Sequence, residues 1–132
     1  MTRPPTAFVV DTDIFIDYLN GVKRIREMLD APGYRIYYSA VTKKELLAKT
    51  GLSATERRRI RMLLQFHRQI PIDERIAGRF SSLLEKYANR GLRKADALVA
   101  ATAWSRRLPL LTRNTRHYRF ISEITLLNPT DL

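Results

Sequence analysis

Short apolar runs alternate along the chain with segments in which apolar residues recur at helical spacing. Residues 7–10 form a β-branched, apolar run that predicts a fully buried strand. Apolar residues at positions 14, 15, 18 and 19 then predict a helix, which ends at Asn20-Gly21 because both residues tolerate the left-handed cap conformation. The same pattern predicts further strands at 35–38, 70–72, 108–111 and 124–127, and further helices at 22–29, 41–49, 74–88, 96–104 and from Ser53 onward.

This alternation favours a single α/β domain over residues 1–132, with a parallel sheet that carries helices on both faces. Pro71 places the strand at 70–72 at a strand end or a sheet edge, since proline cannot donate a ladder hydrogen bond. Ligands of such sheets bind beyond the carboxyl ends of the strands, near the point where the strand order reverses. The helix that begins at Ser53 is expected to bury Ile60, Leu63, Leu64 and Phe66.

Composition narrows the chemistry. The 132 residues include 24 Lys and Arg against 13 Asp and Glu, and the net charge of +11 predicts a polyanionic partner such as nucleic acid. The absence of cysteine excludes a disulfide framework, a cysteine-ligated metal and a thiol nucleophile, and two histidines argue against a histidine-rich metal site. No apolar run reaches the length of a secretory signal or a membrane span. We therefore expect a cytoplasmic protein with no membrane interaction.

A few acidic and amide residues stand where an alternating fold brings them to one edge of the sheet. Asp11 follows the first strand and Asn114 follows the fourth, while helices bring Glu45 and Asp96 toward the same edge. Carboxylates gathered in this way repel one another, and a hard divalent cation such as Mg²⁺ or Mn²⁺ removes the repulsion. In a basic protein, a cation held by carboxylates is typical of phosphodiester hydrolysis.

Each of these residues also has a structural interpretation. Asp11 suits a helix N-cap, and residues 42–45 (TKKE) match a capping box that includes Glu45. Asp96 suits a helix start, where it interacts with the helix dipole, and Asn114 suits a turn. Asp17 suits a solvated position or an ion pair.

Four stretches carry a pattern that spans nearly the whole chain: residues 9–19 (VVDTDIFIDYL), 39–47 (SAVTKKELL), 94–103 (KADALVAATA) and 110–118 (LLTRNTRHY). Each stretch is degenerate alone, but four of them in this order make a specific signal. Together they resemble the PIN-domain family and, within it, the VapC-type toxins of toxin–antitoxin pairs.

The resemblance implies a three-layer α/β/α sandwich around a mainly parallel sheet, and an Mg²⁺- or Mn²⁺-dependent endoribonuclease activity. Carried over by position, it implies catalytic roles for Asp11, Glu45, Asp96 and Asn114, the first three as metal ligands. Asn114 carries no charge and stands where many relatives have a fourth acid. Supporting roles in hydrogen bonds or added negative charge fall to Thr12, Asp13, Ser39 and Thr112.

We expect hydrolysis that leaves 5′-phosphate and 3′-hydroxyl ends. Such hydrolysis needs no 2′-hydroxyl nucleophile, so His117 is not expected to act as a general base. Residues 57–61 are expected to form a solvated helix face. The contacts expected to RNA phosphates are Arg93, Lys94, Arg113 and Arg116.

The resemblance also implies protein partners. They are a VapB-like antitoxin, whose C-terminal segment fills an apolar groove, and a second copy of the chain in a homodimer. The groove is expected on the early helices, at residues that suit the core equally well: Tyr18, Leu19, Ile25, Met28 and Leu29.

Two other functions are compatible with an α/β domain of this kind. A non-catalytic PIN-like RNA-binding module is the main alternative, and the combination of Asp11, Glu45 and Asp96 argues against it. A nucleotide-binding domain ranks lower, because the chain has neither Gly-x-Gly-x-x-Gly nor a Walker-type Gly-Lys-Ser/Thr loop.

Overall fold

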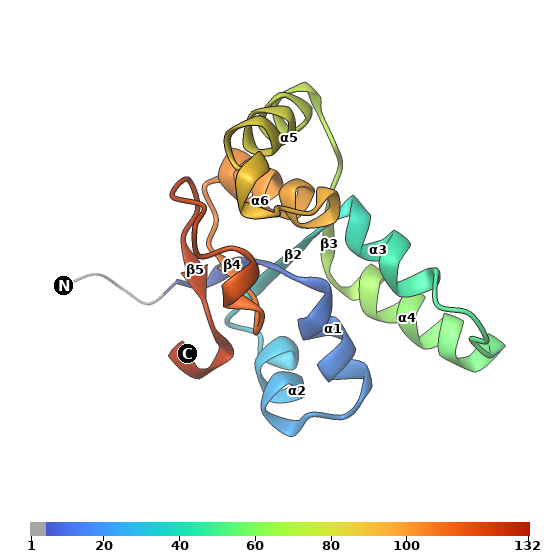
Figure 1. Cartoon of the computed structure of the whole chain (residues 1–132). Helices are drawn as coiled ribbons and strands as arrows, with labels where there is room; N and C mark the ends of the chain where they lie inside the picture. Colours follow the sequence, from blue (N-terminus) through green and yellow to red (C-terminus); the bar gives the residue numbers. More distant parts are fainter. Residues whose placement is uncertain (1–4) are drawn as a thin grey trace.

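The computed structural model describes residues 5–132 of the chain. Strands and helices alternate along it, as the hydrophobic pattern predicts (Figure 1). In chain order the elements are β1 (Ala7–Val10), α1 (Thr12–Leu19), α2 (Lys23–Asp30), β2 (Arg35–Ser39), α3 (Ala40–Leu47), α4 (Ala54–Phe66), β3 (Arg68–Ile70), α5 (Glu74–Lys86), η1 (Ala88–Arg90), α6 (Lys94–Arg106), β4 (Leu110–Leu111), η2 (Thr115–His117), β5 (Leu126–Leu127) and η3 (Pro129–Asp131), where η marks a 3₁₀ helix.

The strands form one five-stranded sheet in the order β3-β2-β1-β4-β5. Every neighbouring pair is parallel, which confirms the predicted parallel sheet. Strand β1 lies at the centre, with Phe8 opposite Ile36 of β2 and Val10 opposite Leu111 of β4. Strand β3 lies at the edge and ends before Pro71, so the proline interrupts no ladder.

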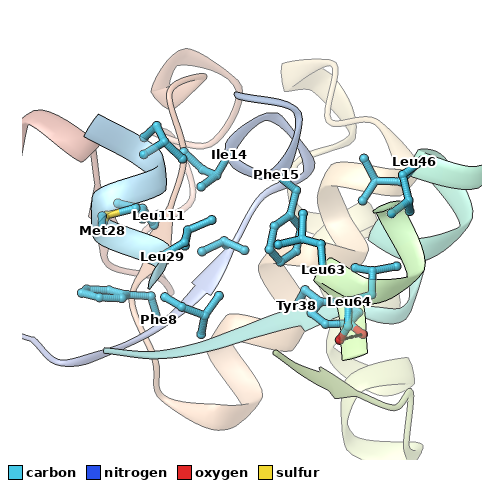
Figure 2. Close-up of a cluster of buried hydrophobic side chains, with 14 residues drawn as sticks. Phe8, Ile14, Phe15, Met28, Leu29, Tyr38, Leu46, Leu63, Leu64 and Leu111 are labelled. Carbon is cyan, nitrogen blue, oxygen red and sulfur yellow. Dashed lines mark hydrogen bonds between the residues drawn. The ribbon is translucent and has the colours of Figure 1, made fainter. Parts of the chain in front are cut away.

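Helices cover both faces of the sheet. Side chains of a strand point alternately to opposite faces, so the buried strand β1 contributes apolar side chains to both. Phe8 and Val10 belong to a cluster of buried side chains that α1, α2, α3 and α4 complete (Figure 2). Val9, between them, belongs to the cluster of α5 and α6 on the other face. The three-layer α/β/α sandwich that the resemblance implies is therefore confirmed.

Local signals account for most of the helix starts. The side chains of Asp11, Ser39, Ser53 and Asp73 each accept a backbone hydrogen bond as the N-caps of α1, α3, α4 and α5. Ser53 and Glu56 form a complete capping box. The turn after α1 uses Gly21 at φ +79°, a left-handed conformation that favours glycine.

One predicted core residue is wrong. Ile60, Leu63 and Leu64 of α4 are buried as expected, but the side chain of Phe66 is 73% exposed. Phe66 is the last residue of α4 and shares a helix face with Met62, four residues earlier, which is exposed as well. Two strands are also shorter than predicted, since β4 covers only 110–111 of the predicted 108–111 and β5 only 126–127 of the predicted 124–127.

Within residues 5–132, no helix combines the length and the apolar character that a membrane crossing requires.

The packing of α4 predicts that substitutions at two neighbouring side chains, Met62 and Leu63, change the free energy of unfolding by different amounts. Leu63→Ala leaves a cavity in the cluster of Figure 2 and should lower the free energy of unfolding by about 2–4 kcal/mol. Met62→Ala, at a side chain that is 62% exposed, should change it by less than about 0.5 kcal/mol. Urea unfolding of both variants checks this, and equal losses would contradict the assigned helix face.

Candidate active site at the carboxyl end of the sheet

The candidate site lies where the order of the strands reverses. From β1 the chain adds β2 and β3 on one side of the sheet, and β4 then pairs with the other side of β1. Asp11 follows β1 and Thr112 follows β4, so the two residues leave the sheet side by side. The backbone of Asp11 donates a hydrogen bond to the carbonyl of Leu111, at 3.0 Å, which locks the two strand ends together.

Both oxygens of Asp11 are engaged. Its Oδ1 accepts a hydrogen bond from the backbone of Thr12 at 2.8 Å, so the interpretation of Asp11 as a helix N-cap is correct. Its Oδ2 accepts from the hydroxyls of Thr112 and Tyr118, each at 3.0 Å. Asp11 is buried, and its carboxylate therefore combines a structural role with a place in the site.

Asp96 reaches the same place from the first turn of α6. Its Oδ1 accepts a hydrogen bond from the Tyr118 hydroxyl at 3.2 Å, so this hydroxyl contacts both Asp11 and Asp96. Its Oδ2 lies 3.4 Å from Nε of Arg93 and 3.6 Å from Nδ1 of His117. The sequence pattern gives no role to Tyr118, although it stands within the fourth motif, because the carboxylates that its hydroxyl contacts are far away in the chain.

Asp13 extends the acidic cluster along α1. Its Oδ2 accepts from the backbone N–H of Arg113 at 2.9 Å and lies 3.5 Å from the Thr112 hydroxyl. Its Oδ1 is buried and has no hydrogen-bond partner within residues 5–132. The Arg113 guanidinium lies 2.6 Å from Asp17 and 3.9 Å from Asp13, so Asp17 is the ion-pair partner that one interpretation expected.

Burial dominates the electrostatics of the cluster. It raises the pKa of Asp11 above its ordinary value, and the charge of Asp96 adds to the effect, against hydrogen bonds from Thr12, Thr112 and Tyr118. Burial, followed by the charge of Asp11, raises the pKa of Asp13 to about 6. The hydrogen bonds thus leave part of the negative charge without compensation.

The remaining predicted ligands lie at the margin of the cluster. Glu45 is exposed on α3, and its Oε1 accepts a hydrogen bond from the Thr12 hydroxyl at 2.7 Å. The capping box proposed for Glu45 is wrong, because α3 begins at Ala40 and Thr42 lies inside the helix. Asn114 is exposed at the start of η2, where its backbone N–H donates to the Thr112 hydroxyl at 3.0 Å.

Ser39 serves the fold directly. It is fully buried, and its hydroxyl caps α3 by accepting from the backbone of Val41 at 3.3 Å. Ser39 can therefore affect the site only indirectly, because it helps to position α3, which carries Glu45.

The donor chemistry fits a hard divalent cation. Every acidic side chain of the cluster offers oxygen, one Asp13 oxygen is buried without a partner, and the raised pKa values mark uncompensated negative charge. As the side chains stand, no group of three His, Cys, Asp or Glu in the described part of the chain is arranged to hold a metal ion. Glu45 is hydrogen-bonded to Thr12 instead, and the Oδ2 atom of Asp96 is paired with Arg93 and His117.

A basic pocket of about 250 Å³ opens beside Asp96. The Arg90 guanidinium stacks on Phe120 there, 5.1 Å from the ring centroid. Of the predicted RNA contacts, Arg93 and Arg116 line this pocket, Lys94 is exposed at the start of α6, and Arg113 is paired with Asp17. The residues that line this Asp96 pocket are Arg90, Gly91, Arg93, Asp96, Arg116, His117 and Phe120.

Comparison with known proteins identifies the fold family. Residues 8–121 match the family described as the PIN domain, and the chain therefore belongs to that family. It is similar to a chain of a toxin–antitoxin complex from Klebsiella pneumoniae, with 30% identity and a TM-score of 0.75 over 92% of this chain and 97% of that one. No curated protein matches the chain.

Two further solved structures share the fold. A chain of VapBC-1 from nontypeable Haemophilus influenzae has 22% identity and a TM-score of 0.80, over 94% of this chain and 98% of that one. A chain of DNA-bound VapBC from Salmonella typhimurium has 23% identity and a TM-score of 0.79, over 95% and 99%. Together with the family match, these similarities confirm the resemblance to VapC-type PIN domains that the four motifs indicate.

The raised pKa of Asp13 predicts how stability depends on pH in the absence of metal. The folded state holds this proton up to pH about 6, whereas the unfolded chain releases it near 3.8, so folding stability falls as pH rises between these values. The difference corresponds to roughly 3 kcal/mol. Unfolding in EDTA from pH 4 to 7 should show this fall in the parent and a shallower one in Asp13→Asn.

The exposed Glu27→Gln, in a pair with Lys23 at 3.9 Å, is the control and should keep the parent's slope. If stability falls with pH equally steeply in the parent and in Asp13→Asn, the pKa of Asp13 is not raised by folding.

Proposed function

We propose that this PIN domain is an endoribonuclease that depends on Mg²⁺ or Mn²⁺ and acts in the cytoplasm as the toxin of a toxin–antitoxin pair. The observation that carries the proposal is the convergence of Asp11, Asp13 and Asp96 on the switch point of the sheet. Burial raises the pKa of Asp11 and of Asp13 in spite of the neighbouring hydrogen bonds, in a chain whose net charge is +11. A cation and a polyanionic substrate together fit this distribution of charge.

Asp11 and Asp96 would hold the cation, and Glu45 would join them by turning away from Thr12. When bound, Mg²⁺ or Mn²⁺ activates water and stabilises negative charge on the phosphate oxygens. Thr112 keeps Asp11 in place through a 3.0 Å hydrogen bond, and Thr12 holds Glu45 at the rim. Asn114, at the exposed start of η2, would contact water or the cation through its amide.

The reaction that we propose adds water across a phosphodiester bond. The water oxygen bonds to phosphorus, the bond from phosphorus to O3′ breaks, and O3′ takes up a proton. The products carry a 5′-phosphate and a 3′-hydroxyl. The 2′-hydroxyl of the RNA does not attack in this reaction, so no general base is needed to deprotonate it. His117, whose Nδ1 lies 3.6 Å from Oδ2 of Asp96, therefore has no such role.

We propose that the RNA strand approaches through the Asp96 pocket. Arg93 and Arg116 line it and would contact phosphates, with Lys94 at its margin. Arg113 can join them only by leaving Asp17, which lies 2.6 Å away. Phosphate contacts of this kind make affinity depend on salt and carry little sequence information.

Asp96→Asn tests the catalytic proposal. The variant loses one negative charge but keeps an oxygen that accepts from Tyr118, so it should fold. RNA cleavage with Mn²⁺ should fall by at least about 100-fold, since even residues that merely orient metal ligands contribute about 10–100-fold. Cleavage assays with and without EDTA, beside circular dichroism of the variant, measure both effects.

Glu85→Gln, at an exposed position of α5, is the matched control and should cleave like the parent. Cleavage by Asp96→Asn at the parent's rate would refute the assigned site. RNA binding by the parent without metal-dependent cleavage would instead favour the non-catalytic RNA-binding module.

An apolar groove gives the proposed antitoxin a place. Two hollows of about 240 and 310 Å³ share Leu19 and Arg59 and together run along α1 and α4. Glu45 lines the first hollow, so a segment in the groove ends beside a proposed ligand. The apolar side chains of this α1–α4 groove are Ile16, Leu19, Leu46, Leu52, Ile60, Tyr18, Met62, Leu63 and Phe66.

We propose that the C-terminal segment of a VapB-like antitoxin occupies the α1–α4 groove. The similar chain from Klebsiella pneumoniae comes from a toxin–antitoxin complex, and a segment bound in the groove would cover the exposed side chains of Met62 and Phe66. Of the residues predicted for the groove, Tyr18 and Leu19 line it, whereas Ile25, Met28 and Leu29 belong to the core. The homodimer is proposed from the family resemblance, and sedimentation of the free protein tests it.

The double variant Met62→Ser/Phe66→Ser tests the groove. It should weaken binding of the antitoxin encoded beside the gene by about 10-fold or more, because buried apolar anchors each contribute more than about 1 kcal/mol. RNA cleavage should stay at the parent's level. Calorimetric titration and a cleavage assay measure the two quantities.

Ile72→Ser is the matched control, because Ile72 is also exposed (49%) but lies outside the groove, between β3 and α5. Equal binding by the double variant and the parent would place the antitoxin elsewhere.

A further inference from the structure

The Tyr118 hydroxyl hydrogen-bonds to two of the three buried aspartates of the site, Asp11 and Asp96. Tyr118 follows η2, is fully buried, and carries its hydroxyl 3.0 Å from Oδ2 of Asp11 and 3.2 Å from Oδ1 of Asp96. Asp11 stands at the end of β1 and Asp96 in the first turn of α6, so they belong to separate elements. Within residues 5–132, no other side chain hydrogen-bonds to both.

Packing alone does not require this hydroxyl. The ring of Tyr118 belongs to the cluster of Val9, Val99 and Leu110, and phenylalanine would fill the same space. A buried hydroxyl without a partner costs free energy, and the partners of this one are the two carboxylates. The oxygen of Tyr118 is therefore explained by the site and not by the core.

The contact also leaves one oxygen of Asp96 facing away from Tyr118. Tyr118 takes Oδ2 of Asp11 and Oδ1 of Asp96. The second oxygen of Asp96 points toward Arg93 and His117, at the Asp96 pocket. The phenol thus links Asp96 to Asp11, whose carboxylate Thr12 and Thr112 also hold in place.

We propose that Tyr118 is a positioning residue that holds Asp11 and Asp96 at the separation at which they receive the divalent cation. The proposal rests on the metal-dependent function proposed above. Ligands that are already placed lose little freedom when a cation arrives, which is how residues behind metal ligands raise metal affinity. Tyr118 itself remains behind the two carboxylates.

Tyr118→Phe tests the proposal by removing one oxygen from a side chain that keeps its ring. Calorimetric titration with Mn²⁺ alone should give a Kd about 10-fold higher than that of the parent. RNA cleavage should fall at low Mn²⁺ and recover at high Mn²⁺, with KM for RNA unchanged. A hydroxyl that only stabilised the fold would produce no such rescue.

Tyr87→Phe is the matched control. Tyr87 is buried in the same cluster, and its hydroxyl bonds Glu123 at 2.5 Å, away from the aspartates. Its loss should leave the Kd for Mn²⁺ unchanged. Where Tyr118→Phe is unfolded without metal, thermal unfolding over a series of Mn²⁺ concentrations gives the same comparison, because the rise in Tm follows the ratio of Mn²⁺ to Kd.

The outcomes separate the two proposals. If the parent and Tyr118→Phe bind Mn²⁺ with the same Kd, the positioning role is overturned and the proposed function stays intact. The same holds if Tyr87→Phe weakens Mn²⁺ binding as much as Tyr118→Phe does. A parent that neither binds Mn²⁺ nor cleaves RNA with it overturns the proposed function, and the positioning role with it.

Discussion

The rest of the structure depends on how the chain tolerates three aspartates in one poorly hydrated place. Asp11, Asp13 and Asp96 are buried together, and burial raises the pKa values of Asp11 and Asp13. Hydrogen bonds from Thr112, Tyr118 and the Arg113 backbone offset part of this charge. The proposed cation would compensate the remainder, since divalent cations prefer carboxylate oxygens.

The parallel sheet makes this concentration of charge possible. Strands β1 and β4 run side by side and end together, so Asp11 and Thr112 meet without any special loop. The Ala-rich helix α6 packs closely on the sheet and brings Asp96 in through its first turn. Hydrophobic contacts between α6 and the sheet thus offset the free energy that it costs to hold the acids close together.

The net charge of +11 is an average over regions with opposite character. The switch point is acidic, and Arg113 is bound to that acidic region by its pair with Asp17. Arg90, Arg93 and Arg116 lie beside it, around the Asp96 pocket. In the proposed function, positive charge at the pocket would attract a phosphate chain, and a cation at the switch point would offset the negative charge that a phosphate meets there.

The sequence by itself determined the order of elements, the parallel sheet, the N-cap at Asp11, the start of a helix at Ser53, and the edge of the sheet to which the acids converge. These depend on local spacing and on the geometry of parallel strands, which a sequence pattern displays directly. Only the tertiary structure decided that Phe66 is exposed, that Glu45 bonds to Thr12, and that Tyr118 joins Asp11 to Asp96. Such contacts unite residues far apart in the chain, and a side chain's role then depends on what lies opposite it.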